Sequence, residues 1–237
     1  MEIINYLAVI ALASLIHASF QLSVSVLTLL SGHSLSVKHS RARLLRMTGG
    51  FILGVAVITL LLLASATLIV SDIFGSEIPQ IVWLISCLLL LALGGAIWVF
   101  YYRNQAGTTL WIPRWFADYL TSRTKRTRSS AEAFGLGLSS VIGELAFIVP
   151  PMFVSALILI QLPPEWQLIG LAIYVVVSML SVFIIWILVA RGVSLGRIQK
   201  WRETNKRFLQ FSAGAGAIIL GAFVYIVEVV SSVARLF

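Results

Sequence analysis

TGGFILGVAVITLLLLASATLIVS, residues 48–71, contains no charged side chain. The hydrocarbon core of a bilayer is about 30 Å thick, and a helix crosses it with about 20 consecutive apolar residues. We therefore expect this stretch to be a membrane-spanning helix. The composition agrees, because 59% of the 237 residues are hydrophobic and 11% are charged, whereas ordinary soluble domains carry about 25% charged residues.

Five further apolar runs have a comparable length. They cover about 7–31, 79–102, 133–161, 167–190 and 208–231. Each is long enough to cross a bilayer with some tilt. The first run lacks the positively charged start of a signal peptide, so we expect it to be retained as a span. The sequence thus predicts an all-α integral membrane protein of six transmembrane helices.

The basic residues are confined to alternate loops. All lysines and arginines except Arg235 lie in 32–47, 103–132 and 191–207, and the loops at 72–77 and 163–165 carry acids and no base. Cytoplasmic loops are enriched in lysine and arginine. We therefore expect the basic segments on the cytoplasmic side of the plasma membrane, against anionic lipid headgroups, with both termini extracytoplasmic. No base-reading motif accompanies the net charge of +8, so nucleic-acid binding is not expected.

The middle basic segment predicts an amphipathic helix on the membrane surface. Its apolar side chains recur at helical period, and its charged side chains fall off that stripe. Aromatic rings beside a basic tail suit the cytoplasmic interface, although an ordinary linker helix would occupy the same place. The stripe consists of Trp111, Ile112, Trp115, Phe116, Tyr119 and Leu120.

Two groups of three spans must run through the membrane in opposite directions, because three is an odd number. Residues 93–100 (LGGAIWVF) resemble 219–226 (ILGAFVYI), and 14–20 (SLIHASF) align with 140–146 (SVIGELA). Inverted repeats of this kind are typical of secondary transporters, which bind substrate between the repeats. We expect a first repeat over 1–102, a cytoplasmic linker over 103–132 and a second repeat over 133–237.

Glu144 is an acidic side chain near the middle of the fourth apolar run. An ionisable residue in hydrocarbon costs about 2.5–3.5 kcal/mol, so it predicts a function or a buried partner. Pro150 and Pro151 follow, and proline removes a backbone donor and frees carbonyl groups one turn earlier. We expect a helix break at these prolines, and a site for a cation or an ammonium group formed with the Glu144 carboxylate.

The first span carries polar side chains at spacings of three and four residues. This pattern predicts one polar face along a helix, directed at Glu144. Histidine is the residue type that can titrate near neutral pH, so we expect that His17 could form a proton-linked pair with Glu144. Hydrogen bonding between packed helices is the alternative role for Gln21 and the hydroxyl groups. The residues are Ser14, His17, Gln21, Ser25 and Thr28.

The layout resembles the lysine-exporter superfamily and its relatives, the membrane thiol–disulfide carriers of cytochrome c biogenesis. The three-plus-three spans and the prolines of the fourth span carry the resemblance, and residues 205–225 are similar to the final span of the carriers. Those carriers place a redox cysteine beside proline in spans one and four. Cys87 is the only cysteine and lies in span three, so dithiol exchange within this chain is excluded. The proline–glycine motif of the amino-acid exporters is also missing from span one.

We predict a secondary transporter, of exporter type, for a small polar solute, an amino acid or a cation. Glu144 and His17 would provide proton coupling, and Gln21, Ser25, Pro150 and Pro151 would complete the binding site. The alternative is a membrane scaffold that binds lipids or partner proteins without transport. No hydrolase or metalloprotease motif, metal-ligand cluster or cofactor lysine is present in the sequence, so neither an enzyme nor a cofactor is expected. Glycine-lined helix faces, as at Gly50-xxx-Gly54 and Gly135-x-Gly137, predict close packing and would suit a homodimer.

Overall fold

The computed structural model describes residues 2–20, 22–36, 41–75, 77–101 and 114–230, and every regular element in these ranges is a helix. The predicted all-α fold is confirmed. The α-helices are α1 (Glu2–Ser19), α2 (Leu22–Ser36), α3 (Arg41–Phe74), α4 (Gln80–Ala96), α5 (Arg114–Arg126), α6 (Ser130–Ile142), α7 (Leu145–Gln161), α8 (Pro164–Ser178), α9 (Leu180–Ala190), α10 (Leu195–Thr204) and α11 (Lys206–Val224). Short π-helices, η1 (Ile97–Tyr101) and η2 (Tyr225–Val230), extend α4 and α11.

Within the described ranges, three helices are long and apolar enough to cross a membrane unaided. They are Ala42–Phe74, Gln80–Phe100 and Lys206–Val230. Three bent pairs, α1 with α2, α6 with α7, and α8 with α9, raise the number of candidate spans to six if each pair is one span. The bends measure 50°, 79° and 50° in that order. Where the structure describes them, the six apolar runs of the sequence form helices, and three of the runs are interrupted by a bend.

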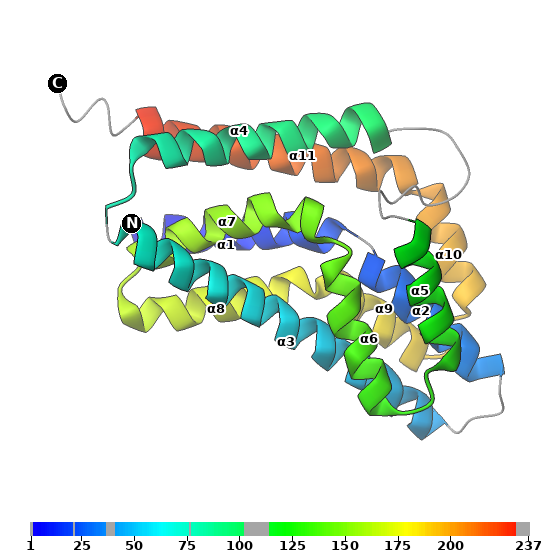
Figure 1. Cartoon of the computed structure of the whole chain (residues 1–237). Coiled ribbons are helices and arrows are strands. Elements are labelled where there is room, and N and C mark those ends of the chain that lie inside the picture. Colours follow the sequence, from blue (N-terminus) through cyan, green and yellow to red (C-terminus); the bar gives the residue numbers. More distant parts are fainter. Residues whose placement is uncertain (1, 21, 37–40, 76, 102–113, 231–237) are drawn as a thin grey trace.

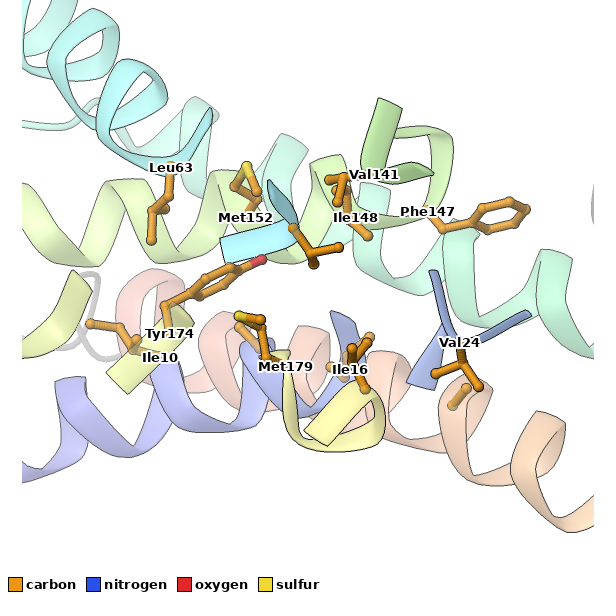
Figure 2. Packing of buried hydrophobic residues seen from close by; sticks show 14 of the residues in the cluster. Ile10, Ile16, Val24, Leu63, Val141, Phe147, Ile148, Met152, Tyr174 and Met179 are labelled. Atoms are coloured by element: carbon orange, nitrogen blue, oxygen red, sulfur yellow. The ribbon is translucent and has the colours of Figure 1, made fainter. Parts of the chain in front are cut away.

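Helices from opposite halves of the chain pack against each other. Helix α4 lies along α11, α3 lies along α6, and α1 packs between α7 and α8 (Figure 1). The helices of the N-terminal half, α1, α3 and α4, thus make their main contacts with helices of the C-terminal half. Buried apolar side chains fill the space between α1, α3, α7 and α8, where the Tyr174 ring lies among Ile10, Met152 and Met179 (Figure 2).

Glycines allow two of these helix pairs to approach closely. A Cβ atom on Gly54 would overlap the Phe134 carbonyl oxygen, and one on Gly137 would overlap the Phe51 carbonyl oxygen, so α3 and α6 are in backbone contact. Gly94 and Gly214 have the same role between α4 and α11. Small residues permit such contacts between membrane helices. Gly135 of the predicted packing motif faces open space.

The basic segments gather at one end of the bundle. Figure 1 shows the start of α1 and the end of η2 at one end, and α5 and α10 at the opposite end. Helix α5 packs against α2 and α6, with Leu120 buried and Trp115 69% exposed. Trp111 and Ile112, part of the predicted aromatic stripe, lie outside the described residues. The position of helix α5 on a membrane surface stays a prediction.

Candidate functional site

Glu144 lies at the break between α6 and α7, with 2% of its surface exposed. Its carbonyl oxygen accepts the N–H groups of Phe147 and Ile148, so its backbone starts α7. Its side chain reaches the first bent pair, where Oε1 accepts the Ser23 N–H at 2.6 Å. Ser23 stands in the first turn of α2, and a helix N-terminus favours a negative group. One carboxylate therefore connects the beginnings of two half-helices.

His17 faces the same carboxylate from the last turn of α1. Its Nε2 lies 4.0 Å from Glu144 Oε2, and its Nδ1 lies 3.2 Å from the Tyr174 hydroxyl. All three side chains are buried. When the Tyr174 hydroxyl donates to Nδ1, the imidazole proton stands on Nε2, the nitrogen that faces Glu144. The arrangement joins two titratable groups from opposite halves of the chain, with a phenol behind the imidazole.

A small cavity lies beside this pair. The cavity has a volume of about 10 Å³. This is room for one water molecule. The lining residues come from α3 and from all three helix breaks. They are His17, Phe20, Ser23, Val55, Thr59, Glu144, Ser178, Met179, Ser181 and Val182. The three interruptions of the bundle thus converge on one point.

This convergence concentrates backbone polar groups at the cavity. Helices α1, α6 and α8 end there, and α2, α7 and α9 begin there. The last carbonyl groups and first N–H groups of a helix have no partner within that helix. Irregular backbone at membrane depth is tolerated only where it is buried in protein or lines a cavity. The ends of these helices bring polar side chains, including His17, Ser23 and Glu144, to the cavity.

Pro150 and Pro151 do not form the predicted break. Both lie inside α7, and the chain breaks at Gly143 and Glu144, about two turns earlier. The missing proline N–H groups affect only the carbonyl groups of residues 146 and 147, which belong to the first turn of α7. The packed neighbours keep this turn helical, since Phe147 and Pro151 are both buried.

The predicted polar face of the first span is divided between two helices. Helix α1 ends at Ser19 and α2 begins at Leu22, with a bend of 50° between them. Ser25 accepts a hydrogen bond from Arg202 Nη2 at 3.2 Å. Burial lowers the pKa of the Arg202 guanidinium below its usual range. Gln21 lies outside the described residues.

Two participants were missing from the sequence-based site. Tyr174 contacts His17, and Thr59 lines the cavity from α3. Each is one of several polar residues scattered along an apolar run, so nothing in the sequence distinguishes Thr59 from Thr48 or Thr67, or Tyr174 from Ser178 or Ser181. Sequence spacing does not tell which side of a buried helix meets a distant carboxylate.

Among the described residues, no three histidine, cysteine or acidic side chains gather where they could hold a metal ion. No protein-family model, curated protein or solved structure matches the chain. The resemblance to the lysine-exporter superfamily and to the thiol–disulfide carriers therefore stays a prediction.

Proposed function

We propose that the chain is a secondary transporter of the cytoplasmic (plasma) membrane, in which Glu144 carries the coupling proton or cation. The observation that carries this proposal is the convergence of three interrupted helices on one buried carboxylate. Broken helices whose ends face a small polar site are the arrangement by which secondary transporters bind ions. His17, opposite Glu144, would exchange protons with it.

The size of the cavity favours an ion over a larger solute. In this conformation it admits one water-sized particle, whereas an amino acid has several non-hydrogen atoms and needs a much larger space. The cavity therefore suits the coupling ion, and a solute would bind only after the half-helices move apart. The substrate classes expected from the sequence, small polar solutes, amino acids and cations, all remain within the proposal.

The packing suggests which parts would move. Glycine contacts hold α3 against α6 and α4 against α11. The bends at Phe20, Gly143 and Met179 lie outside these contacts, at the cavity itself. Alternating access proceeds by rocking one bundle against another around a fixed site. We infer that the half-helices α2, α7 and α9 turn about the breaks while the glycine-bound pairs stay intact.

The orientation proposed from the charges is compatible with the fold. The beginning of α1 and the end of η2 lie at one end of the bundle, and basic α5 and α10 lie at the other (Figure 1). We propose that the basic end is cytoplasmic and that the two pseudo-equivalent halves form an inverted repeat.

Reconstitution tests the proposed transport directly. The purified chain is placed in proteoliposomes that contain a pH-sensitive dye, and gradients of sodium, potassium or mixed amino acids are imposed in turn. We expect at least one gradient to change the internal pH faster than in protein-free vesicles. Identical traces with every gradient would contradict proton-coupled transport of these solutes.

A membrane scaffold is the second candidate, and the surface of α5 is the observation that favours it. Trp115 and Tyr119 are exposed there, and the last turn carries Arg123, Lys125 and Arg126. Aromatic side chains beside basic ones suit a lipid headgroup region with anionic lipids. The scaffold hypothesis needs no movement at the cavity, so it predicts no response in the reconstitution assay.

Replacing Arg123, Lys125 and Arg126 together with glutamine tests the lipid contact. We expect the melting temperature of the wild-type chain to be higher in nanodiscs with anionic lipid than in zwitterionic ones, and the triple variant to lose most of this difference. Each basic residue near an anionic surface contributes about 1 kcal/mol. A difference of equal size in both proteins would show that these three side chains do not contact the headgroups.

A further inference from the structure

Thr59 has a hydroxyl group that is fully buried and has no hydrogen-bond partner among the described residues. The other threonines of α3 do form side-chain hydrogen bonds. Thr48 and Thr67 donate to the carbonyl oxygens of Leu44 and Leu63, four residues earlier, at 2.9 and 2.8 Å. The Thr59 hydroxyl does not turn back onto its own helix, and the residue lines the cavity that Glu144 also lines.

A buried polar group without a partner costs stability, so a native structure that keeps one needs a reason for it. A particle bound in the cavity would provide the missing partner. The residues around the cavity offer oxygen atoms: the Glu144 carboxylate, the Thr59 hydroxyl, and the hydroxyls of Ser23 and Ser178. The Ser178 hydroxyl already donates its proton to the Val175 carbonyl, at 3.0 Å, which leaves its oxygen lone pairs for another group.

We propose that this cavity is a sodium site, with Thr59 Oγ1 and the Glu144 carboxylate as two of its ligands. The inference deepens the proposed function and rests on it, since it names the cation that exchanges with the coupling proton at Glu144 and a selectivity residue of the same site. Oxygen donors suit a hard cation such as sodium. The carboxylate supplies the opposite charge.

Sodium and a proton would then compete for Glu144. The titratable groups that face the carboxylate are His17 from α1 and, behind it, Tyr174 from α8. The described cavity residues of α2, α3 and α9 are apolar or carry hydroxyl groups. Protonation of Glu144 removes the negative charge that holds the cation. Sodium binding should therefore strengthen as the pH rises through the titration of this carboxyl group.

Thermal unfolding of the purified full-length chain in detergent tests the site. Scans are run in sodium chloride and in choline chloride at equal ionic strength, at two pH values. We expect sodium to raise the melting temperature of the wild-type chain by several degrees, and more at the higher pH, because a ligand that binds the folded state stabilises it. Glu144→Gln should lose this sodium-dependent shift.

Thr59→Val is expected to raise the melting temperature in choline and to abolish the sodium-dependent shift. Both effects together are expected only if Thr59 is a sodium ligand. Valine matches threonine in shape and removes the unpaired hydroxyl, so the melting temperature in choline should rise by about 2–4 °C. The sodium-dependent shift should fall to near zero. Thr59→Ser keeps the hydroxyl and should keep the shift, and so should the control Thr67→Val, whose hydroxyl bonds to its own helix.

Equal melting temperatures of the wild type in sodium and choline would overturn the sodium site, as would an unchanged shift in Thr59→Val. Failure of the site can be distinguished from failure of the proposed function. Solute-driven proton movement in proteoliposomes without any sodium shift would leave transport standing and remove the sodium site. A sodium shift that depends on Thr59, without proton movement, would keep the site and remove proton-coupled transport.

Discussion

Gly137→Ala is expected to lower the melting temperature of the chain by about 6–12 °C. A methyl group at this position would overlap the Phe51 carbonyl oxygen and lie 3.0 Å from the Val55 nitrogen. Both are backbone atoms of α3 and cannot rotate away as a side chain could, so α3 and α6 must separate. Overpacking costs about 1–3 kcal/mol, and we expect the upper end, at about 2–4 °C for each kcal/mol.

Gly135→Ala is the matched control on the same helix. A Cβ atom at Gly135 meets nothing within 4 Å, so only the helix propensity changes. Alanine is more favourable than glycine in a helix by about 1 kcal/mol. The control should therefore melt at the same temperature as the wild type or slightly higher. Similar losses in both variants would show that the α3–α6 backbone contact does not stabilise the fold.

The positions of the helices follow directly from the apolar runs. A segment of about 20 apolar residues has few alternatives to a helix when its backbone polar groups must pair within the segment. Glycine motifs were less informative, because glycine spacing does not show which face meets a neighbour. Gly50, Gly54 and Gly137 lie in the α3–α6 contact, but Gly135 does not.

The helix breaks could not be predicted from the same reasoning. Prolines predicted the break in the fourth span at Pro150, yet it occurs at Glu144, whose carboxylate accepts the Ser23 N–H at the beginning of α2. The break at Met179 has neither proline nor glycine beside it. Both depend on tertiary contacts around the cavity, which no local pattern contains.

Two residues of the candidate site, His17 and Glu144, could be predicted from the sequence. His17 and Glu144 occupy nearby positions when residues 14–20 are aligned with 140–146. The fold places His17 Nε2 4.0 Å from Glu144 Oε2. The hydrogen bond between Ser25 and Arg202 could not be predicted, because it joins two helices 177 residues apart in the sequence. Thr59 and Tyr174 were not predicted. A hydroxyl group in an apolar helix can bond to the backbone of its own helix, as those of Thr48 and Thr67 do, and the sequence does not tell this role from a place in a site.

Glu144→Gln is expected to reduce solute-driven proton movement in proteoliposomes by at least about tenfold. Glutamine retains an oxygen that can accept the Ser23 N–H, so the meeting point of α2 and α7 should survive the change. What is lost is the negative charge and the ability to bind and release a proton. A carboxylate that carries the coupling proton cannot be replaced by an amide, which neither binds nor releases a proton in the ordinary pH range.

Two comparisons make the result specific. Glu165→Gln removes an exposed acid at the start of α8, outside the cavity, and should leave proton movement unchanged. Glu144→Asp keeps the titrating group on a shorter side chain and should retain part of the activity, with a changed dependence on pH. Thermal unfolding of each purified variant shows that the fold is intact. Full proton movement in a folded Glu144→Gln protein would remove the carboxylate from the mechanism and leave it as the group that stabilises the α2 N-terminus.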